Sequence, residues 1–272
     1  MNDHAQFLHT SSEVAVQRWD GARASAGRDC VAEEVPLALI YNGTPHAVMM
    51  ASPSDIEDFA LGFSLSEAVI DTRAQFRAVE TDHAGDGIAV YIDIDKERAL
   101  RLESQHRNLA GRTGCGLCGA ETIEQAVRHP APVGDGVRVA AQALQRALAR
   151  LAQRQALNAK TGAVHAAAWA TPDGELVAVR EDVGRHNALD KMIGALAAEG
   201  RSFEEGFALI TSRASFEMAQ KAATVGITLL AAISAPTGLA IRLAQEAGLT
   251  LIGFARGSQC NVYTNPQRLT GG

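Results

Sequence analysis

The first hundred residues combine short apolar runs with turn signals. Apolar residues dominate 35–42 and 44–51, and Asn42-Gly43 between them predicts a hairpin because both residues tolerate a positive φ. A broad apolar face over 54–69, which Ser54 can cap, predicts a helix that packs against this sheet. Further strands are predicted at 88–94 and 100–102. This half of the chain is typical of a compact α+β domain.

Beyond about residue 139 the apolar pattern changes. Leucines near helical spacing over 139–157 predict one amphipathic helix, and buried apolar runs then alternate with helical segments. We expect strands at 163–170, 176–180, 207–211, 227–233 and 249–254, and helices at 187–198, 215–224 and 237–247. Three apolar strands joined by two helices imply a parallel sheet that is covered on both faces, to which the first two strands add an antiparallel hairpin.

A segment without hydrophobic period separates the two halves. Residues 105–121 are rich in glycine, and a run of helix-breaking residues follows at 129–136. The sequence therefore predicts three parts. These are a poorly structured N-terminal extension over 1–30, an α+β domain over 31–130 that ends in the glycine-rich loop, and an α/β domain over 131–272.

Composition narrows the class of protein. The chain has 272 residues, 47% of them hydrophobic, and 25 basic against 31 acidic residues give a net charge of −6. This balance argues against a general nucleic-acid-binding surface, which needs an excess of basic residues. No run approaches the roughly 18 consecutive apolar residues of a membrane span, and the polar first residues do not resemble a signal peptide. We therefore expect a cytoplasmic protein whose four cysteines are thiols.

Two of the four cysteines lie close together in a glycine-rich motif. Cys115 and Cys118 stand in the sequence Gly-Cys-Gly-Leu-Cys-Gly, where glycine lets the backbone approach a partner closely. Arg112 and the start of a following helix favour the thiolate, which is the nucleophilic form of cysteine. Exposed thiolates of this kind suit sulfur transfer through a persulfide.

Three other interpretations of this motif stay open. It can be half of a zinc site, but tetrahedral zinc needs two more ligands, which Cys260 or His129 would have to supply from a distance. It can be a thioredoxin-like dithiol, although such a pair normally lies between a strand and a helix. It can also be two idle thiols on a surface loop. Cys30 and Cys260 stand alone in the sequence, as core cysteines often do.

Polar residues follow each of the predicted parallel strands. Ser212 and Arg213 follow the first strand, 234–237 the second, and Arg256 with Gly257 the third. In open α/β sheets, ligands bind beyond the carboxyl ends of parallel strands, and helix N-termini there favour anions. The pattern predicts a site for a phosphate-bearing ligand, although each hydroxyl can instead cap the next helix. No glycine-rich dinucleotide motif or P-loop follows a strand.

The densest polar run is Arg-Glu-Asp-Val-Gly-Arg-His-Asn at 180–187, between a predicted strand and a predicted helix. It can be a ligand-binding loop, or a solvated loop in which Asp182 or Asn187 caps the helix. His165 lies within an apolar strand, where a satisfied core histidine is commoner than a catalytic one. The residues alone assign no role to His165, Asp182 or His186.

Together these motifs closely resemble the formate dehydrogenase accessory sulfurtransferase family, the FdhD-type proteins. The resemblance runs from about residue 35 to the C-terminus. It rests on the segments 113–119, 161–165, 180–191, 213–217 and 253–257.

The resemblance implies a cytoplasmic homodimer that accepts sulfur from a cysteine desulfurase. The sulfur is transferred to the molybdenum cofactor, bis-molybdopterin guanine dinucleotide, before this cofactor enters formate dehydrogenase. By position, Cys115 and Cys118 match the family's persulfide-carrying pair. The segment that matches the cofactor-binding residues is Phe254, Ala255, Arg256, Gly257, Ser258 and Gln259, and we expect Ser212 and Arg213 beside it. A guanine nucleotide can then mimic the cofactor, and no zinc, nucleic acid or membrane is expected to bind.

The family's second domain resembles the cytidine deaminase fold, which implies a three-layer α/β/α domain beside the smaller α+β domain. Zinc deaminases use the motifs His-x-Glu and Pro-Cys-x-x-Cys. The similarly placed segments here are 165–167 and 212–215, which lack the glutamate and both cysteines, so we do not expect deamination. The alternative function is a non-catalytic chaperone that binds the molybdenum cofactor and carries a structural or redox CxxC.

Overall fold

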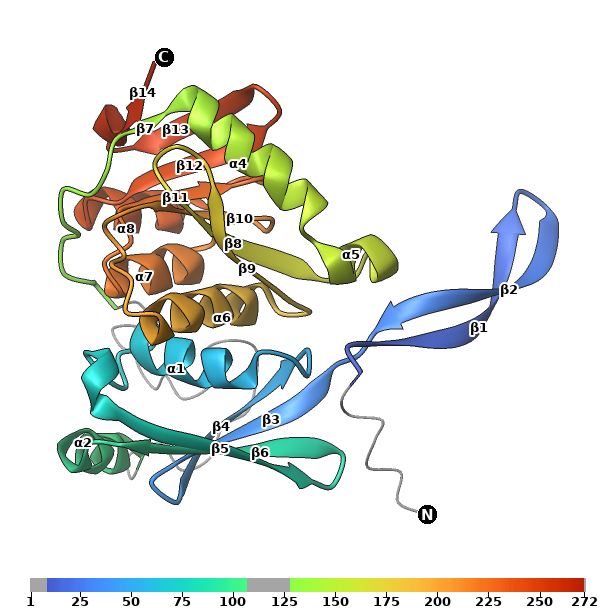
Figure 1. Cartoon of the computed structure of the whole chain (residues 1–272), viewed down its shortest axis with the longest axis horizontal. Coiled ribbons are helices and arrows are strands. Elements are labelled where there is room, and N and C mark those ends of the chain that lie inside the picture. Colours follow the sequence, from blue (N-terminus) through green and yellow to red (C-terminus); the bar gives the residue numbers. More distant parts are fainter. Residues whose placement is uncertain (1–8, 107–127, 272) are drawn as a thin grey trace.

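The computed structural model describes residues 9–106 and 128–271 (Figure 1). It contains a six-stranded sheet and a four-stranded sheet, with helices between them. A two-stranded hairpin extends to one side of this body.

The four-stranded sheet belongs to the N-terminal half of the chain. Its strands, in the order β4-β3-β6-β5, are Thr44–Ala51, Val35–Tyr41, Gly87–Ile94 and Phe76–Ala84. The pairs β3–β4 and β5–β6 are antiparallel, whereas β3 and β6 run parallel. Asn42 and Gly43 connect β3 to β4 with φ values of 47° and 87°, which confirms the predicted hairpin.

The helices of this half differ from the predicted pattern. Helix α1, Ile56–Ser66, begins after Asp55 rather than Ser54, and Asp55 adopts a left-handed conformation. Helix α2, Lys96–His106, lies where the sequence predicted a strand at 100–102, so that prediction is wrong. Ala99 and Leu102 are buried while Leu100 is 65% exposed, which is the spacing of a helix face, but three residues are too few to reveal it. A single 3-10 turn, Arg73–Gln75, leads into β5.

Residues 11–32 form a regular hairpin, whereas the sequence predicted little structure for residues 1–30. Strands β1, Ser11–Asp20, and β2, Arg23–Ala32, pair over their whole length, and Gly21 between them has a φ of 57°. The hairpin stands away from the body in Figure 1, and none of its residues is fully buried. Only Val14 and Val16 of β1 show the apolar alternation by which a sequence reveals a strand that faces a core, and two residues are too few to predict it.

The six-stranded sheet belongs to the C-terminal half. Its strands, in the order β13-β12-β11-β10-β8-β9, are Gln259–Thr264, Thr250–Arg256, Leu229–Ala232, Phe207–Ile210, His165–Ala170 and Leu176–Asp182. The neighbours β10, β11 and β12 are parallel, and β8 with β9 forms an antiparallel hairpin, as the sequence predicted. Strand β13 adds an antiparallel edge that was not predicted.

Helices cover both faces of this sheet (Figure 1). Helix α4, Ala141–Gln153, packs on one face, and α6, Arg185–Ala198, α7, Phe216–Thr224, and α8, Gly238–Glu246, pack on the other. The helix predicted over 139–157 is interrupted, because α4 ends at Gln153 and α5, Ala156–Thr161, follows. Three short elements complete the fold, namely β7, Val139–Ala140, the 3-10 turn Pro266–Arg268, and β14, Leu269–Thr270, which pairs with β7. The likeness to the cytidine deaminase fold stays a prediction.

Helix α1 joins the two halves by packing along α6. A Cβ atom on Gly62 of α1 would stand 1.7 Å from the backbone oxygen of Asp190, and one on Gly194 of α6 would stand 1.8 Å from that of Asp58. The two helices approach this closely because both positions are glycine. One hydrophobic cluster then runs from β3 through α1 and α6 to β10, so the two predicted domains share a core. Among the described helices, none is both long and apolar enough to cross a membrane.

Candidate functional site

The carboxyl ends of β10, β11 and β12 lie at one edge of the six-stranded sheet, since these strands are parallel neighbours. Backbone hydrogen bonds join the segments that follow them. Thr237 N donates to Ala214 O (3.0 Å), and Phe254 N donates to Ser234 O (3.1 Å). The three polar segments that the sequence predicted here therefore form one continuous rim. We call it the strand-end site and define it as residues 211–215, 234–237 and 254–259.

Phe254 is the most unusual residue of the strand-end site. Its φ of 52° is left-handed, which is rare for an aromatic residue, and it is 43% exposed. A Cβ atom on the preceding Gly253 would stand 2.7 Å from Pro236 Cδ, so the backbone here approaches the next loop closely. The pairing of β12 with β13 also shifts register between Gly253 and Arg256. Strained residues and bulges of this kind cluster at ligand sites, where they aim a side chain.

Residues 256–259 are exposed around the turn from β12 to β13, where Gly257 has a φ of 54°. Arg256 Nε donates to Ile233 O (2.9 Å), which holds the side chain against the end of β11. Within the described chain its two Nη groups have no partner, so they can bind an anion. Ala255, by contrast, is 1% exposed and can offer a ligand only its backbone.

Ser212 and Arg213 lie at the same rim, but only the side chain of Arg213 is accessible to a ligand. Ser212 is buried, and its hydroxyl donates to Arg213 O (3.1 Å). Arg213 is exposed, and its guanidinium group makes neither a hydrogen bond nor an ion pair with the described residues. Thr237 caps α8 by accepting a hydrogen bond from Ala240 N (3.3 Å). Arg213 therefore fits the predicted anion site better than the hydroxyl groups do.

A second polar group of residues lies at this edge, where β8, α6 and α7 begin. We call His165, Arg185, His186 and Glu217 the α6–α7 cluster. His186 Nε2 lies 2.9 Å from Glu217 Oε2, and Arg185 Nη2 lies 3.8 Å from the same oxygen. The contact with His186 lowers the pKa of Glu217, and the charge of Arg185 adds to this effect. Burial lowers the pKa of His165, as do the nearby Arg185 and His186.

Asp182 is a structural carboxylate. It accepts hydrogen bonds from Ser52 N (3.0 Å), Gly184 N (2.7 Å) and Asn187 Nδ2 (3.0 Å), and it lies 2.6 Å from Lys191 Nζ. The carboxylate and this ammonium group are both completely buried. The polar run 180–187 thus has two roles, since Asp182 fixes the loop and the next turn presents Arg185 and His186 of the α6–α7 cluster.

Cys115 and Cys118 lie outside the described residues. Cys30 and Cys260 are free thiols, and burial raises the pKa of Cys260, which packs on the core beneath α4. Residues 9–106 and 128–271 contain no group of three or more His, Cys, Asp or Glu side chains that could hold a metal ion. His129, which the sequence offered as a zinc ligand, lies 2.9 Å from Glu246 Oε2.

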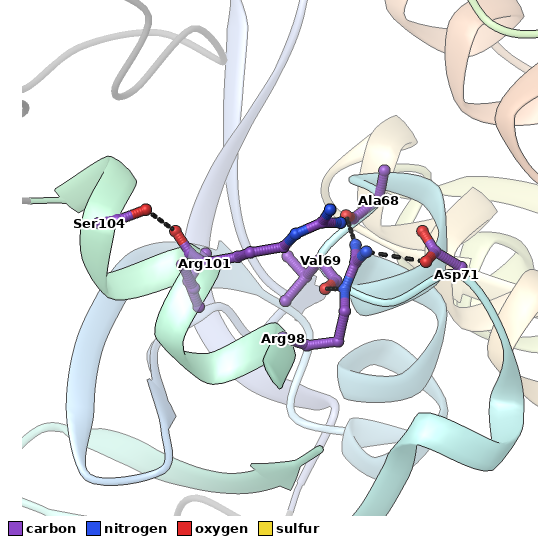
Figure 2. A pocket seen from close by; sticks show the side chains of 7 residues that line it. Ala68, Val69, Asp71, Arg98, Arg101 and Ser104 are labelled. Atoms are coloured by element: carbon purple, nitrogen blue, oxygen red, sulfur yellow. Dashed lines mark hydrogen bonds and ion pairs between the residues drawn. The ribbon is translucent and has the colours of Figure 1, made fainter. Parts of the chain in front are cut away.

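A pocket of about 360 Å³ lies between α2 and the segment that follows α1 (Figure 2). Arg98 in its wall donates to Val69 O (2.8 Å), Ala68 O (2.6 Å) and Asp71 Oδ2 (2.8 Å). Ala68 has a left-handed φ of 55°, and its carbonyl group is one of those that Arg98 holds. These bonds attach the loop to α2, so Arg98 serves the fold, and no residue of the strand-end site lines this pocket.

Comparison with known proteins agrees with the resemblance drawn from the motifs. The model of the FdhD/NarQ family matches residues 32–270. The sulfur carrier protein FdhD of Xanthomonas euvesicatoria is 55% identical over 254 residues, which cover 93% of this chain and 90% of that protein. The sulfur carrier protein FdhD of Cupriavidus necator is 52% identical over 260 residues, which cover 96% of this chain and 90% of that protein.

A solved structure from Desulfotalea psychrophila shows the same fold. It superposes with a TM-score of 0.79 over 96% of this chain and 100% of that one, at 22% sequence identity. The family match covers most of the chain, and two relatives share more than half of their residues with it. The chain therefore belongs to the FdhD/NarQ family.

Proposed function

We propose that this chain is a sulfur carrier that serves the maturation of formate dehydrogenase. The family match carries this proposal, since relatives are named sulfur carrier protein FdhD and the matched residues include Cys115 and Cys118. We infer further that a cysteine desulfurase supplies the sulfur and that bis-molybdopterin guanine dinucleotide receives it as substrate. The chain is then a cytoplasmic sulfurtransferase with a persulfide intermediate.

The first step of this chemistry moves one sulfur atom between two proteins. A thiolate at Cys115 or Cys118 attacks the terminal sulfur of the desulfurase persulfide. A new S–S bond forms on this chain, the S–S bond of the donor breaks, and the donor cysteine leaves as a thiolate. Because one S–S bond replaces another, the step needs no oxidant or reductant.

The second cysteine provides the two electrons that turn the carried sulfur into sulfide. Its thiolate attacks the carrier cysteine, the bond to the terminal sulfur breaks, and sulfide passes to the substrate. A disulfide between Cys115 and Cys118 remains, and a cellular dithiol reductant must restore both thiols. These steps need two cysteines close together in the chain, as Cys115 and Cys118 are.

The strand-end site is suited to the guanine nucleotide part of the substrate. The exposed ring of Phe254 offers a surface on which a base can stack, and the free guanidinium nitrogens of Arg256 and Arg213 can bind phosphate. The helices α7 and α8 begin at this rim, and their N-termini favour anions. An acidic protein can hold an anionic ligand in this way, because the binding charge is local.

Mass spectrometry tests the persulfide step directly. After incubation with a cysteine desulfurase and cysteine, we expect the protein to gain the mass of one sulfur atom at Cys115 or Cys118. The gain should disappear after treatment with a dithiol and in the Cys115→Ala, Cys118→Ala double variant. Cys30→Ala and Cys260→Ala are the matched controls and should label as the wild type does. Labelling that persists in the double variant contradicts the proposal.

The same double variant separates the carrier from a chaperone that only binds the cofactor. A carrier loses sulfur transfer and the activation of formate dehydrogenase, while it still binds a guanine nucleotide. A chaperone whose cysteines carry no sulfur keeps the activation of formate dehydrogenase in this variant, provided that circular dichroism shows the variant to be folded. Activation by the double variant would therefore favour the chaperone.

Calorimetry with GDP tests the ligand site. We expect Arg256→Ala to weaken GDP binding about tenfold, because a hydrogen bond to a charged group contributes about 1.5 kcal/mol or more. Arg201→Ala is the control, since this exposed arginine follows the far end of α6 and pairs with Glu199. Unchanged affinity in Arg256→Ala would exclude this arginine from the phosphate site.

The family resemblance also leads us to propose a homodimer. Light scattering coupled to size exclusion measures the mass of the particle in solution. A mass of two chains supports the proposal, and a mass of one chain at working concentration contradicts it.

A further inference from the structure

We propose that Arg185, with His165 beside it, forms a second oxyanion subsite at the strand-end edge and binds a phosphate group of the nucleotide-bearing ligand. This inference rests on the proposed function, because it extends the same ligand site. It adds the α6–α7 cluster to the residues that contact the ligand.

The side chain of Arg185 is two-thirds enclosed and yet makes no hydrogen bond to the described residues. It is 31% exposed, and its Nε atom is buried without a partner. Its Nη2 atom lies 3.8 Å from Glu217 Oε2, which is too long for a hydrogen bond. An arginine has five N–H donors, and enclosing them without acceptors is costly. A ligand that brings oxygen atoms to Arg185 removes this cost.

Other enclosed arginines of this chain show what a structural role looks like. Arg98 donates three hydrogen bonds to oxygen atoms, and Arg268 donates four. Arg180, whose side chain is 26% exposed, donates to Asp58 and to a backbone carbonyl group. Arg185 departs from this pattern because its side chain has no such acceptor among the described residues. Its backbone is nevertheless fixed, since it lies in the first turn of α6 and Asp182 holds the start of that helix in place.

His165 supplies a neutral partner at the same place. It begins β8 and is half-buried, and its ring makes no hydrogen bond to the described residues. Burial, together with the charges of Arg185 and His186 of α6, lowers the pKa of His165, which favours the neutral ring. A neutral imidazole can donate one hydrogen bond to a phosphate oxygen without repelling the guanidinium group.

Glu217 does not cancel the attraction for an anion. Its Oε2 lies 2.9 Å from His186 Nε2, nearer than to Arg185, and it belongs to the first turn of α7. The N-termini of α6 and α7, which have 14 and 9 residues, both add positive potential at this point. The nearest contact of Glu217 is therefore with His186, whose buried Nε2 also lacks a well-directed hydrogen bond among the described residues.

The test compares three probes by calorimetry: GDP, guanosine and inorganic phosphate. We expect Arg185→Gln to weaken GDP binding about tenfold, because the variant loses one contact to phosphate, and a tenfold change corresponds to about 1.4 kcal/mol. Inorganic phosphate should no longer compete with GDP for binding to this variant. Guanosine, which lacks phosphate, should bind the variant and the wild type equally. Arg185→Lys keeps the charge and should keep part of the affinity, while Arg201→Gln is the control. Circular dichroism and thermal unfolding establish that each variant is folded.

The outcomes separate this inference from the proposed function. Wild-type protein that binds GDP, together with an Arg185→Gln variant that binds it equally well, overturns the inference alone. A variant that loses only the binding of inorganic phosphate shows a site for free phosphate and also overturns it. Wild-type protein that binds no guanine nucleotide overturns the proposed ligand and this subsite with it. Additive losses in the Arg185→Gln, Arg256→Ala double variant support two separate phosphate contacts.

Discussion

Lys221 is the centre of a buried ion network that joins α1, α6 and α7. Its Nζ lies 2.7 Å from Glu67 Oε1, 2.8 Å from Asp190 Oδ2 and 3.0 Å from Ser66 Oγ. Arg128 pairs with the other oxygen of Glu67. Burial of Glu67 opposes its charged form, but the charges of Lys221 and Arg128 outweigh this and lower its pKa to about 2. The network ties the two halves of the molecule together by charge.

Glu67 consequently gives the folded protein a stability that depends on pH. Folding lowers its pKa below the ordinary 4.5, so its contribution is complete above that pH and is lost as the pH falls toward about 2. We expect Glu67→Gln to lower the free energy of unfolding at neutral pH and to flatten its decline in acid. Urea denaturation at a series of pH values measures both effects. Glu205→Gln, at an exposed position, is the control, and a variant curve parallel to the wild type would contradict the prediction.

At the scale of elements, the contact between α1 and α6 reverses the usual effect of a helix glycine. Replacing glycine by alanine inside a helix normally stabilises a protein by up to about 1 kcal/mol. Here a Cβ atom at Gly62 or Gly194 would overlap a backbone oxygen, so the helices must separate. We expect Gly62→Ala and Gly194→Ala each to lower the free energy of unfolding by about 1–3 kcal/mol.

Gly238 provides the matched control for this prediction. It lies in the first turn of α8, and a Cβ atom there would stand 3.6 Å from Arg242, which is an ordinary contact. Gly238→Ala should therefore be neutral or stabilising in the same urea experiment. Equal effects of all three substitutions would mean that the α1–α6 crossing tolerates a side chain.

The sequence predicted the elements whose burial leaves a regular pattern. The apolar strands β10, β11 and β12 and the helices between them were predicted because each packs on a neighbouring layer. The hairpin β1–β2 was missed, since it faces no core. Helix α6 was predicted with an inward face, but Asn187 to Ala197 are all buried because the sheet covers one side and α1 the other. Such a helix reveals its depth only when its neighbours are known.

The candidate site, too, could be predicted from the sequence only in part. Arg213, Phe254 and Arg256 were predicted from their place after parallel strands, and the strands bring them to one rim. The contact of Glu217 with His186 joins two helices that are far apart in the sequence, so no residue spacing predicts it. Asp182 and Arg185 are neighbours in one polar run, yet one is bonded in the interior and the other is free. The sequence distinguishes such roles poorly, because charged residues serve both for structural contacts and for ligand binding.

At the scale of the whole molecule, the shared core predicts one cooperative unit. A fragment of residues 131–272 would expose the side of α6 that packs on α1, so we expect it not to fold independently. The full chain should unfold in a single transition. Trp169 is 3% exposed and Trp19 is 66% exposed, so a Trp19→Phe variant leaves one fluorescent reporter in the core. Coincident fluorescence and circular dichroism curves are expected, and two separated transitions would show independent domains.

The left-handed backbone at Phe254 implies that selection for stability and selection for ligand binding favour different residues at this position. A side chain in this conformation costs roughly 1–3 kcal/mol, and glycine would adopt it without that cost. Selection for heat resistance alone should therefore enrich glycine at position 254, and the selected proteins would lose the ring on which a base can stack. Thermostable members of a randomised library would in this way reveal residues that are retained for their ligand.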